Sequence, residues 1–401
     1  MNTSNTNTQA TDLQEVTPWK ANCGKDGFEY DRLIEQFGVT KIDDELINRF
    51  EKITGKPAHI WLKRGIFFAH RELDEILTDY EQGKQIFLYT GRGPTTDALH
   101  LGHMIPFMFT KWLQDVFDAI LVIQIADEEK YYFKDMEFEK IYNLGFENAK
   151  DIIACGFNPD KTFIFSSRDY NMTSCAYNTI LEMRKKFNIN TLKSIFGLDD
   201  SSNIGQYEWT ISQMAASLSR YFEPIFGKAK IRCLIAYAID QDPYFRGIRD
   251  KAKQLGSLKP CSIITQFLPA LEGSSKMNST QTGTQSTKTI FMTDDPANIS
   301  KTINRYAFSG GRDTIEEHRK YGADVDKDMS YQYLRYFMED DIELARIANE
   351  YKSGSMLTSE IKTILANILT KVITDHQTKR AMVTPEIIKQ FYNISKFETS
   401  K

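Results

Sequence analysis

Three consecutive pieces of sequence decide the fold of this chain: Gln85-Ile-Phe-Leu-Tyr-Thr90, Gly91-Arg-Gly-Pro-Thr-Thr96 and His100-Leu-Gly-His103. An apolar, β-prone run comes first, a glycine turn follows, and a polar helix start comes last. A strand of this kind delivers its end to a helix N-terminus, where free backbone N–H groups bind phosphate. The stretch therefore predicts a nucleotide site.

The turn between the strand and the helix contains two glycines on either side of an arginine. Gly91 and Gly93 lack a Cβ, so the backbone there is free to adopt positive φ or to touch a ligand directly. Arg92 adds a permanent positive charge. We expect the glycines to contact the nucleotide, and Arg92 either to assist the reaction or to hold the glycine turn.

Two histidines occupy the predicted helix start. His100 and His103 are three residues apart and should share one face of the first turn, where the helix dipole also favours an anion. Gly102 leaves that face open for a base or a ribose. This motif alone leaves an alternative open, namely an ordinary strand–turn–helix with two surface histidines.

A second motif, Gly273-Ser-Ser-Lys276-Met277-Asn-Ser279-Thr280, sets one lysine among small and hydroxyl-bearing residues. A mobile loop of this composition is able to carry an ammonium group to a pyrophosphate and then withdraw. Solvated linkers often have the same composition, so this signal is weak by itself.

The two motifs, in this order and at this separation, resemble the signature pair of class I aminoacyl-tRNA synthetases. Longer matches are similar to the tryptophanyl-tRNA synthetase family of eukaryotic cytosolic type, and the resemblance covers nearly the whole chain after residue 15. These matches lie at residues 16–19 (Val-Thr-Pro-Trp), 89–94 (Tyr-Thr-Gly-Arg-Gly-Pro), 238–241 (Ala-Ile-Asp-Gln) and 308–313 (Phe-Ser-Gly-Gly-Arg-Asp).

Composition indicates a globular protein in a reducing compartment. The chain has 401 residues, of which 41% are apolar and 12% aromatic, and this length suits two or three domains. Five cysteines without C-x-x-C spacing argue against disulfides and a zinc site. The first residues lack a signal-peptide pattern and no apolar run is long enough to span a membrane, so we expect a soluble, cytoplasmic protein. The net charge of −4 implies that any nucleic-acid contact is local.

The first part of the chain is expected to be a tail followed by scaffold. Residues 1–15 are polar and predicted to be disordered. Residues 16–80 should hold a short hairpin with Trp19, which the resemblance places over the active site, and then scaffold helices. His59 and His70 are predicted to be structural.

A Rossmann-like α/β domain with a parallel sheet is predicted for residues 81–294. Apolar runs at 120–126 and 231–239 have the length of buried parallel strands, and 163–165 is a shorter strand inside a helical insertion at about 138–226. Gln124 is a lone amide in an apolar strand, so it needs a buried partner or a ligand. Polar groups just beyond strand ends lie where open α/β sheets bind ligands.

The resemblance assigns roles to individual residues. It implies that His100, His103, Lys276 and Arg92 form the catalytic set, and that Asp240 holds ribose hydroxyls while Gln241 holds the substrate amino group. It further implies an ATP site at Gly91, Gly93, Gly102, Asp240, Met277 and Ser279, and a tryptophan site at Tyr89, Gln124, Glu129, Lys130, Gln213 and Gln241. For Gln213 the small residues around it also fit plain helix packing, and for Asp240 a structural turn is the alternative.

The lysine motif departs from the family in two residues and in the length of the stretch that follows. Asn278 and Thr280 stand where the family has serine, and the low-complexity stretch 278–289 is longer. Asn278 therefore supplies an amide at the position where the family has a hydroxyl group.

An all-helical region is predicted for residues 295–401, opened by Asp295 as N-cap and by Pro296. Further helices are expected at about 314–321, 329–338, 342–351, 361–376 and 385–391. The resemblance makes this region an anticodon-binding domain that uses Phe308, Arg312 and Asp313. Asp313 also has a local interpretation, as a helix N-cap with Glu316 three residues on.

The resemblance, taken with these observations, implies adenylation of L-tryptophan by ATP with Mg²⁺, and transfer to tRNA(Trp) by a homodimer without a structural metal. The tryptophan carboxylate is already a nucleophile, so a positive field from His100, His103, Lys276 and Mg²⁺ should dominate catalysis. The alternatives are a tyrosyl-tRNA synthetase and a non-catalytic nucleotide-binding or signalling protein on the same scaffold.

Overall fold

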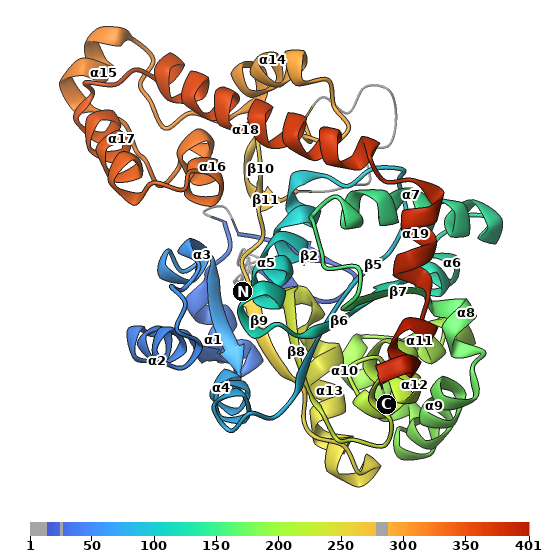
Figure 1. Cartoon of the computed structure of the whole chain (residues 1–401). Helices are drawn as coiled ribbons and strands as arrows, with labels where there is room; N and C mark the ends of the chain where they lie inside the picture. The colour runs from blue at the N-terminus through green and yellow to red at the C-terminus, as the bar shows by residue number, and fades with distance from the viewer. Residues whose placement is uncertain (1–13, 25–26, 278–287, 401) are drawn as a thin grey trace, which may run out of the picture.

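A seven-stranded sheet lies at the centre of the computed structural model, which describes residues 14–24, 27–277 and 288–400 (Figure 1). The strand order is β3-β4-β9-β8-β5-β6-β7. The strands are β3 (Thr40–Lys41), β4 (Phe67–Arg71), β5 (Ile86–Arg92), β6 (Ile120–Ile125), β7 (Thr162–Ser166), β8 (Arg232–Ala238) and β9 (Cys261–Thr265). Strands β5 to β9 pair in parallel, so the predicted Rossmann-like α/β sheet is confirmed.

One edge of the sheet is antiparallel, and the sequence did not indicate it. Strand β4 pairs antiparallel with β9, and β3 with β4, in a segment that was predicted to hold scaffold helices alone. Strand β4 has only five residues between amphipathic helices and ends in His70 and Arg71, so it is too short to show a period of its own, and the prediction was wrong there. The helices of this segment are α1 (Tyr30–Phe37), α2 (Asp44–Thr54), α3 (Ile60–Lys63) and α4 (Leu73–Glu81).

The central strands are buried on both faces, as continuous apolar runs require. On β5, Leu88 belongs to one apolar cluster, and Phe87 and Tyr89 belong to the cluster on the opposite face. Strand β6 alternates in the same way, with Leu121 on the first side and Val122 on the second. The sheet therefore separates two cores.

Two short hairpins lie beside the sheet. The first joins β1 (Glu15–Val16) to β2 (Ala21–Asn22), as predicted, with its turn at Thr17–Lys20. The second joins β10 (Pro269–Ala270) to β11 (Gly273–Lys276) and carries Lys276. Lys276 therefore lies on a paired strand and not in the open loop that its neighbours suggested. The rest of that motif, residues 278–287, lies outside the described residues, as does the predicted tail 1–13.

Helices cover the sheet and form the predicted insertion. Helix α5 (Leu101–Phe117) follows β5, and α6 (Asp127–Phe133) follows β6. The insertion holds α7 (Phe138–Ile153), α8 (Ser167–Asn171), α9 (Ser174–Lys186), α10 (Ile189–Phe196), α11 (Ile204–Ala215), η1 (Ser219–Phe222) and α12 (Glu223–Phe226). After β8 come η2 (Ile239–Gln241), α13 (Asp242–Ala252) and η3 (Lys253–Leu255).

The described residues after Asp295 are helical, as predicted. Asp295 caps α14 through the backbone N–H of Ala297. The helices are α14 (Pro296–Tyr306), α15 (Ile315–Tyr321), α16 (Met329–Phe337), α17 (Asp341–Ser353), α18 (Thr358–Ala381), α19 (Pro385–Tyr392) and η4 (Ser395–Ser400). Figure 1 shows α14 to α17 at one end of the molecule, with α18 leading back so that α19 lies along β7.

Buried polar contacts fix the helical region to the sheet. Trp61 Nε1 on α3 donates to the carbonyl of Tyr336 on α16 at 2.7 Å, and Tyr333 Oη donates to the carbonyl of Pro269 at 2.7 Å. One apolar cluster runs from the sheet into α16 and α18 without a break. None of the helices in the described part of the chain combines the length and the apolar character that a membrane crossing requires.

Candidate functional site

A cavity of about 630 Å³ opens at the carboxyl ends of β5 and β8. These neighbouring strands are the first and the fourth of the five parallel strands in chain order, so they mark the point where the strand order reverses. Ligands of open α/β sheets bind at such a switch point. The cavity is lined by all the predicted ATP, tryptophan and catalytic residues except Ser279, which lies outside the described residues: Tyr89, Gly91, Arg92, Gly93, His100, Gly102, His103, Gln124, Glu129, Lys130, Gln213, Asp240, Gln241, Lys276 and Met277.

The two histidines form a stacked pair at the start of α5. His100 is the N-cap and its Nδ1 accepts from the backbone N–H of His103 at 3.3 Å. The rings are stacked, with their centroids 3.4 Å apart. They therefore act as one aromatic surface at the rim of the cavity.

Hydrogen-bond partners fix the proton positions on both rings. Because His100 Nδ1 accepts, its Nε2 carries the proton. Arg92 Nη1 lies 3.0 Å from His103 Nε2, and arginine only donates, so the proton of His103 is on Nδ1. His100 Nε2, His103 Nδ1 and Arg92 Nη2 are buried and have no hydrogen-bond partner among the described residues. Three N–H donors are thus left for an anion in the cavity.

Burial changes the charge expected of this group. Burial and the charges of Arg92 and Lys276 lower the pKa of His100 to about 3. Burial and Arg92 hold the pKa of His103 well below its ordinary value as well. The expectation that both histidines supply positive charge is therefore corrected: at neutral pH they are uncharged donors, and the charge comes from Arg92 and Lys276. Burial lowers the pKa of Arg92 to about 10, which still leaves it charged at pH 7.

The glycine positions are explained by crowding and not by backbone conformation. Neither Gly91 nor Gly93 belongs to the described glycines with positive φ, and Gly91 lies within β5 instead of a turn. A Cβ on Gly93 would lie 2.0 Å from Cε of Lys130. Gly93 therefore lets Lys130 reach Glu129, with which it forms an ion pair of 2.7 Å beside the cavity.

Tyr89 and Gln124 form a buried polar pair in the apolar part of the cavity. Tyr89 Oη donates to Gln124 Oε1 at 2.5 Å, and Gln124 Nε2 donates to Ser167 Oγ at 3.0 Å. The predicted buried partner of Gln124 is thus provided by the protein. Tyr89 Oη and Gln124 Oε1 each keep a lone pair after this bond, so either oxygen can accept a hydrogen bond from a ligand N–H.

Lys276 reaches the cavity from β11. Its Nζ forms an ion pair of 2.5 Å with Asp240 Oδ2, and it lies 4.6 Å from the ring centroid of Phe267. Asp240 is 5% exposed and follows β8, as predicted. Gln241, next to it, accepts from Gln213 Nε2 on α11 at 3.1 Å.

Two further elements line the cavity: strand β9, which was not predicted from the sequence, and the first hairpin, which was predicted only in outline. Strand β9 ends at Thr265 and brings Phe267 close to Lys276, and the β-branched pair Ile263–Ile264 in its centre would have been the signal. Trp19 of the first hairpin stacks on Phe133 with centroids 4.1 Å apart and donates from Nε1 to the carbonyl of Phe196 at 2.7 Å. The hairpin thus closes one side of the cavity, as the resemblance implied.

A separate group of predicted residues lies at the junction of α14 and α15. Phe308 is 50% exposed, Arg312 Nε donates to the carbonyl of Gly322 at 3.1 Å, and Asp313 is exposed. The N-cap of α15 is Thr314, whose Oγ1 accepts from the backbone N–H of Glu317 at 3.1 Å. The capping role suggested for Asp313 is therefore wrong by one residue, because the threonine hydroxyl reaches the third helical N–H.

Comparisons with known proteins agree with this geometry. The family model of class I tRNA synthetases (W and Y) matches residues 81–374. The cytoplasmic tryptophan–tRNA ligase of Homo sapiens is 48% identical over 395 residues, which are 97% of this chain and 83% of that protein. That of Oryctolagus cuniculus is 48% identical over 94% of this chain and 79% of that protein. The crystal structure of Plasmodium falciparum tryptophanyl-tRNA synthetase has a TM-score of 0.86 at 44% identity and covers 92% of this chain and 98% of that one.

Proposed function

Because the chain belongs to the class I tRNA synthetases of the W and Y family, we propose that it activates L-tryptophan with ATP and transfers the tryptophanyl group to tRNA(Trp). The family includes tryptophan and tyrosine enzymes, and the curated relatives, at up to 48% identity, are tryptophan–tRNA ligases. The observation that carries the proposal is the set of three buried, unpartnered N–H donors on His100, His103 and Arg92. They line the same cavity as Lys276 and Tyr89.

The first step is attack of the tryptophan carboxylate on the α-phosphate of ATP. A bond forms between a carboxylate oxygen and the α-phosphorus, and the bond to the pyrophosphate oxygen breaks, so pyrophosphate leaves with its electron pair. No base is needed because the carboxylate is ionised at pH 7. Catalysis therefore consists of holding the two groups in line and stabilising negative charge on the phosphates.

The residues present fit a triphosphate. His100 Nε2 and His103 Nδ1 are neutral N–H donors in a site with little water, where hydrogen bonds to an anion are strong. We assign Lys276 to the pyrophosphate and Arg92 to holding His103. Gly91, Gly93, Gly102 and Met277 would line the nucleotide, and Asp240 would bind ribose hydroxyls once Lys276 turns to the phosphates. Mg²⁺ would enter with ATP and would neutralise part of the charge on its phosphates.

The amino-acid side of the cavity suits an indole ring. Tyr89 Oη retains a lone pair and Gln124 holds that hydroxyl in place, so an indole N–H would find an acceptor there. Glu129, Lys130, Gln213 and Gln241 would hold the amino and carboxylate groups of the substrate. A phenyl ring without an N–H would leave that lone pair without a donor, and polar sites discriminate against a ligand that lacks the matching group.

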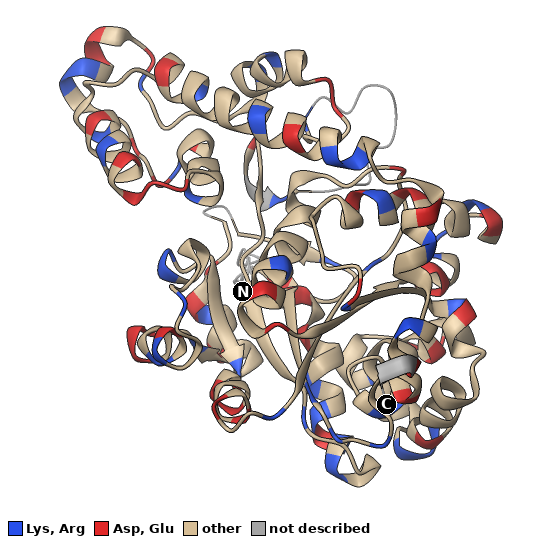
Figure 2. Ribbon diagram, in the orientation of Figure 1, with Lys and Arg blue, Asp and Glu red and all other residues tan. Residues whose placement is uncertain are grey.

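We assign the second step to the helical region from residue 295, with Phe308, Arg312 and Asp313 as contacts to the anticodon. Figure 2 shows acidic and basic residues side by side along α15 and α17, so the helices do not present a uniformly basic surface in this view. Recognition would then depend on base contacts and less on the average field. Release of AMP follows attack of the terminal tRNA ribose on the adenylate carbonyl.

A homodimer is the proposed assembly, formed by the helical insertion, and the cytoplasm is the proposed location. Large apolar side chains on or beside α8 to α11 are exposed: Met172 70%, Tyr177 49%, Leu181 50%, Ile189 59% and Ile204 80%. Exposed apolar groups of this number on neighbouring helices are typical of an interface. The relatives are named cytoplasmic, which supports the location.

Amino-acid-dependent ATP–pyrophosphate exchange tests the proposal. Each of the standard amino acids is supplied with ATP, Mg²⁺ and labelled pyrophosphate, and exchange is expected with tryptophan. Exchange with tyrosine instead would assign the other branch of the family. Absence of exchange with every amino acid, in a protein that still binds ATP, would reject the catalytic function.

A further inference from the structure

Leu99 precedes the N-cap residue His100, and both its N–H and its carbonyl are hydrogen-bonded. The two residues that bind them, Asp151 and Met292, are themselves hydrogen-bonded to side chains of helix α18. Leu99 is fully buried. Its N–H donates to Asp151 Oδ2 at 3.3 Å, and its carbonyl accepts from the backbone N–H of Met292 at 2.8 Å. The position of His100 is therefore set by what Asp151 and Met292 are attached to.

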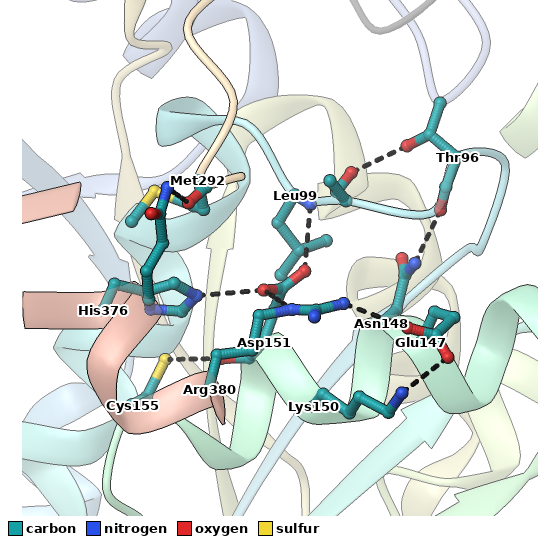
Figure 3. A network of polar contacts seen from close by, with 12 residues as sticks. Thr96, Leu99, Glu147, Asn148, Lys150, Asp151, Cys155, Met292, His376 and Arg380 are labelled. Atoms are coloured by element: carbon teal, nitrogen blue, oxygen red, sulfur yellow. Dashed lines mark hydrogen bonds and ion pairs between the residues drawn. The ribbon is translucent and has the colours of Figure 1, made fainter. Parts of the chain in front are cut away.

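On the N–H side, Asp151 connects Leu99 to α18. Asp151 lies on α7, is fully buried, and its Oδ1 is 3.0 Å from His376 Nε2 and accepts from Arg380 Nε at 2.8 Å. Figure 3 shows the carboxylate between Leu99 on one side and the two α18 side chains on the other. A buried carboxylate needs several donors, and here three donors come from two distant parts of the chain.

On the carbonyl side, a second route leads to the same helix. Gln377 of α18 donates from Nε2 to the carbonyls of Met292 at 3.0 Å and Asp294 at 2.7 Å. Residues 290–292 lie beside residues 99–101, and the N–H of Leu101 donates to the carbonyl of Ile290 at 3.1 Å. Helix α18 thus reaches Leu99 from both sides.

Helix α7 also holds the glycine turn. Asn148, three residues before Asp151, donates from Nδ2 to the carbonyl of Thr96 at 2.6 Å and accepts from Arg92 Nε at 3.0 Å. Arg92 in turn contacts His103. Helix α7 therefore contacts the segment from Arg92 to His103 at several points, and Asp151 connects α7 to α18.

We propose that Asp151 is a positioning residue for the adenylation step: it ties the docking of α18 to the placement of the His100–His103 pair. This inference rests on the proposed function. Asp151 does not line the cavity, so it acts through Leu99 and not on a substrate. Displacement of a catalytic group by about 1 Å is enough to slow a reaction that depends on alignment by about a hundredfold.

The test compares Asp151→Asn with Glu147→Gln. Glu147 lies one turn earlier on α7 and accepts from Arg380 Nη2 at 3.1 Å and Lys150 Nζ at 2.7 Å, but not from Leu99. Both changes replace a carboxylate by an amide and remove an ion pair with Arg380. We expect Asp151→Asn to lower kcat of tryptophan-dependent pyrophosphate exchange, per titrated active site, by about 10- to 100-fold. Glu147→Gln should leave it unchanged.

The readout separates positioning from stability. A merely structural role would reduce the melting temperature and the fraction of active sites, but it would not change kcat per active site. The KM for tryptophan should stay constant in Asp151→Asn, because the altered segment faces the phosphates. An unchanged kcat per active site would overturn the proposal, whereas absence of exchange in the unaltered chain would reject the proposed function itself.

A second variant decides the matter if Asp151→Asn does not fold. Gln377→Leu removes the other route to Leu99 without leaving a buried charge, and should lower kcat per active site in the same direction. Its control is Thr378→Ala, because Thr378 is exposed and its Oγ1 donates to Thr374 of the same helix. Equal kcat values for Gln377→Leu and Thr378→Ala would overturn the link between α18 and the histidines.

Discussion

At the scale of single residues, Lys276 is the clearest test of the reaction. Lys276→Ala should lower kcat for pyrophosphate exchange by about 10²–10³-fold, because it removes a charge that stabilises the developing pyrophosphate. The KM for tryptophan should change little. Lys288→Ala is the control, since Lys288 pairs with Glu272 at the surface nearby. Equal turnover in the two variants would reject the assignment of Lys276 to pyrophosphate.

The histidine pair makes a prediction about pH and stability. Its folded-state pKa values lie below the unfolded value of about 6.5. As the pH falls below 6.5, the unfolded chain binds protons at these positions and the native chain does not, so the free energy of unfolding decreases. The loss continues towards the folded pKa of His100, about 3. Each such group contributes a slope of up to about 1.4 kcal/mol per pH unit.

The measurement is the urea midpoint between pH 7 and 4.5, for the unaltered chain and for the double variant His100→Asn with His103→Asn. Asparagine keeps polar atoms near the same positions but does not titrate in this range. The unaltered chain should therefore show the steeper loss of stability towards low pH. Parallel pH profiles for the two proteins would mean that the native histidines bind protons like the unfolded ones.

The residue types at the site were predictable, and their protonation was not. The predicted strand ends indicated that His100, His103 and Asp240 lie near one another, because parallel strands end at one edge of a sheet, and the family resemblance added Lys276 to them. The charge of the histidines depends on Arg92, which approaches His103 only after folding. A sequence contains no sign of burial that deep, so the expectation of two charged imidazoles failed for a physical reason.

At the scale of elements, the first hairpin is predicted to complete the cavity without supporting the fold. A stacked aromatic pair contributes about 0.5–1.5 kcal/mol. Trp19→Ala should therefore lower kcat/KM for tryptophan by up to about tenfold, with a melting temperature close to that of the unaltered chain. Lys20→Ala, which removes an exposed ion pair with Glu15, is the control. Full activity of Trp19→Ala would show that the hairpin does not close the site.

Two neighbouring residues at the start of α15 are predicted to have different roles: Thr314 caps the helix, and Asp313 contacts the anticodon. Thr314→Ala should cost about 1 kcal/mol of stability, since it removes the observed cap, and leave tRNA charging per folded molecule intact. Asp313→Asn should leave stability intact and reduce charging by tenfold or more, on the order of a lost base contact of about 1–3 kcal/mol. Exchange without tRNA serves as the reference. Normal charging by Asp313→Asn would remove Asp313 from the anticodon site.

Element prediction succeeded where periodicity was long and failed where it was short. The helix predicted at 361–376 corresponds to α18, which runs from Thr358 to Ala381. Strands β4 and β9 were missed, because each has only five residues and their pairing with each other joins segments about 190 residues apart in the chain. Such pairing depends on the folded sheet and cannot be predicted from the local sequence of either strand.

At the scale of the whole molecule, the helical region and the sheet share one hydrophobic core and are not connected by the chain alone. The apolar cluster continues from the sheet into α16 and α18, and the ion pair between Asp151 and Arg380 crosses the same junction. The sequence indicated a second helical domain after residue 295 but gave no sign of this shared core. Tertiary packing, and not the boundary in composition, determines how the helical region is attached to the sheet.

The proposed dimer is tested by charge placed on the insertion. Ile204 is 80% exposed at the first position of α11, where an aspartate favours the helix, so Ile204→Asp should leave the monomer folded. In an apolar interface the same charge would be unpaired, and the dimer should dissociate at least tenfold more readily, a loss of about 1.4 kcal/mol or more. Ile342→Asp is the matched control, because Ile342 is 84% exposed in the first turn of α17, outside the insertion. Sedimentation velocity over a dilution series measures both, and equal dissociation constants for the two variants would place the interface elsewhere.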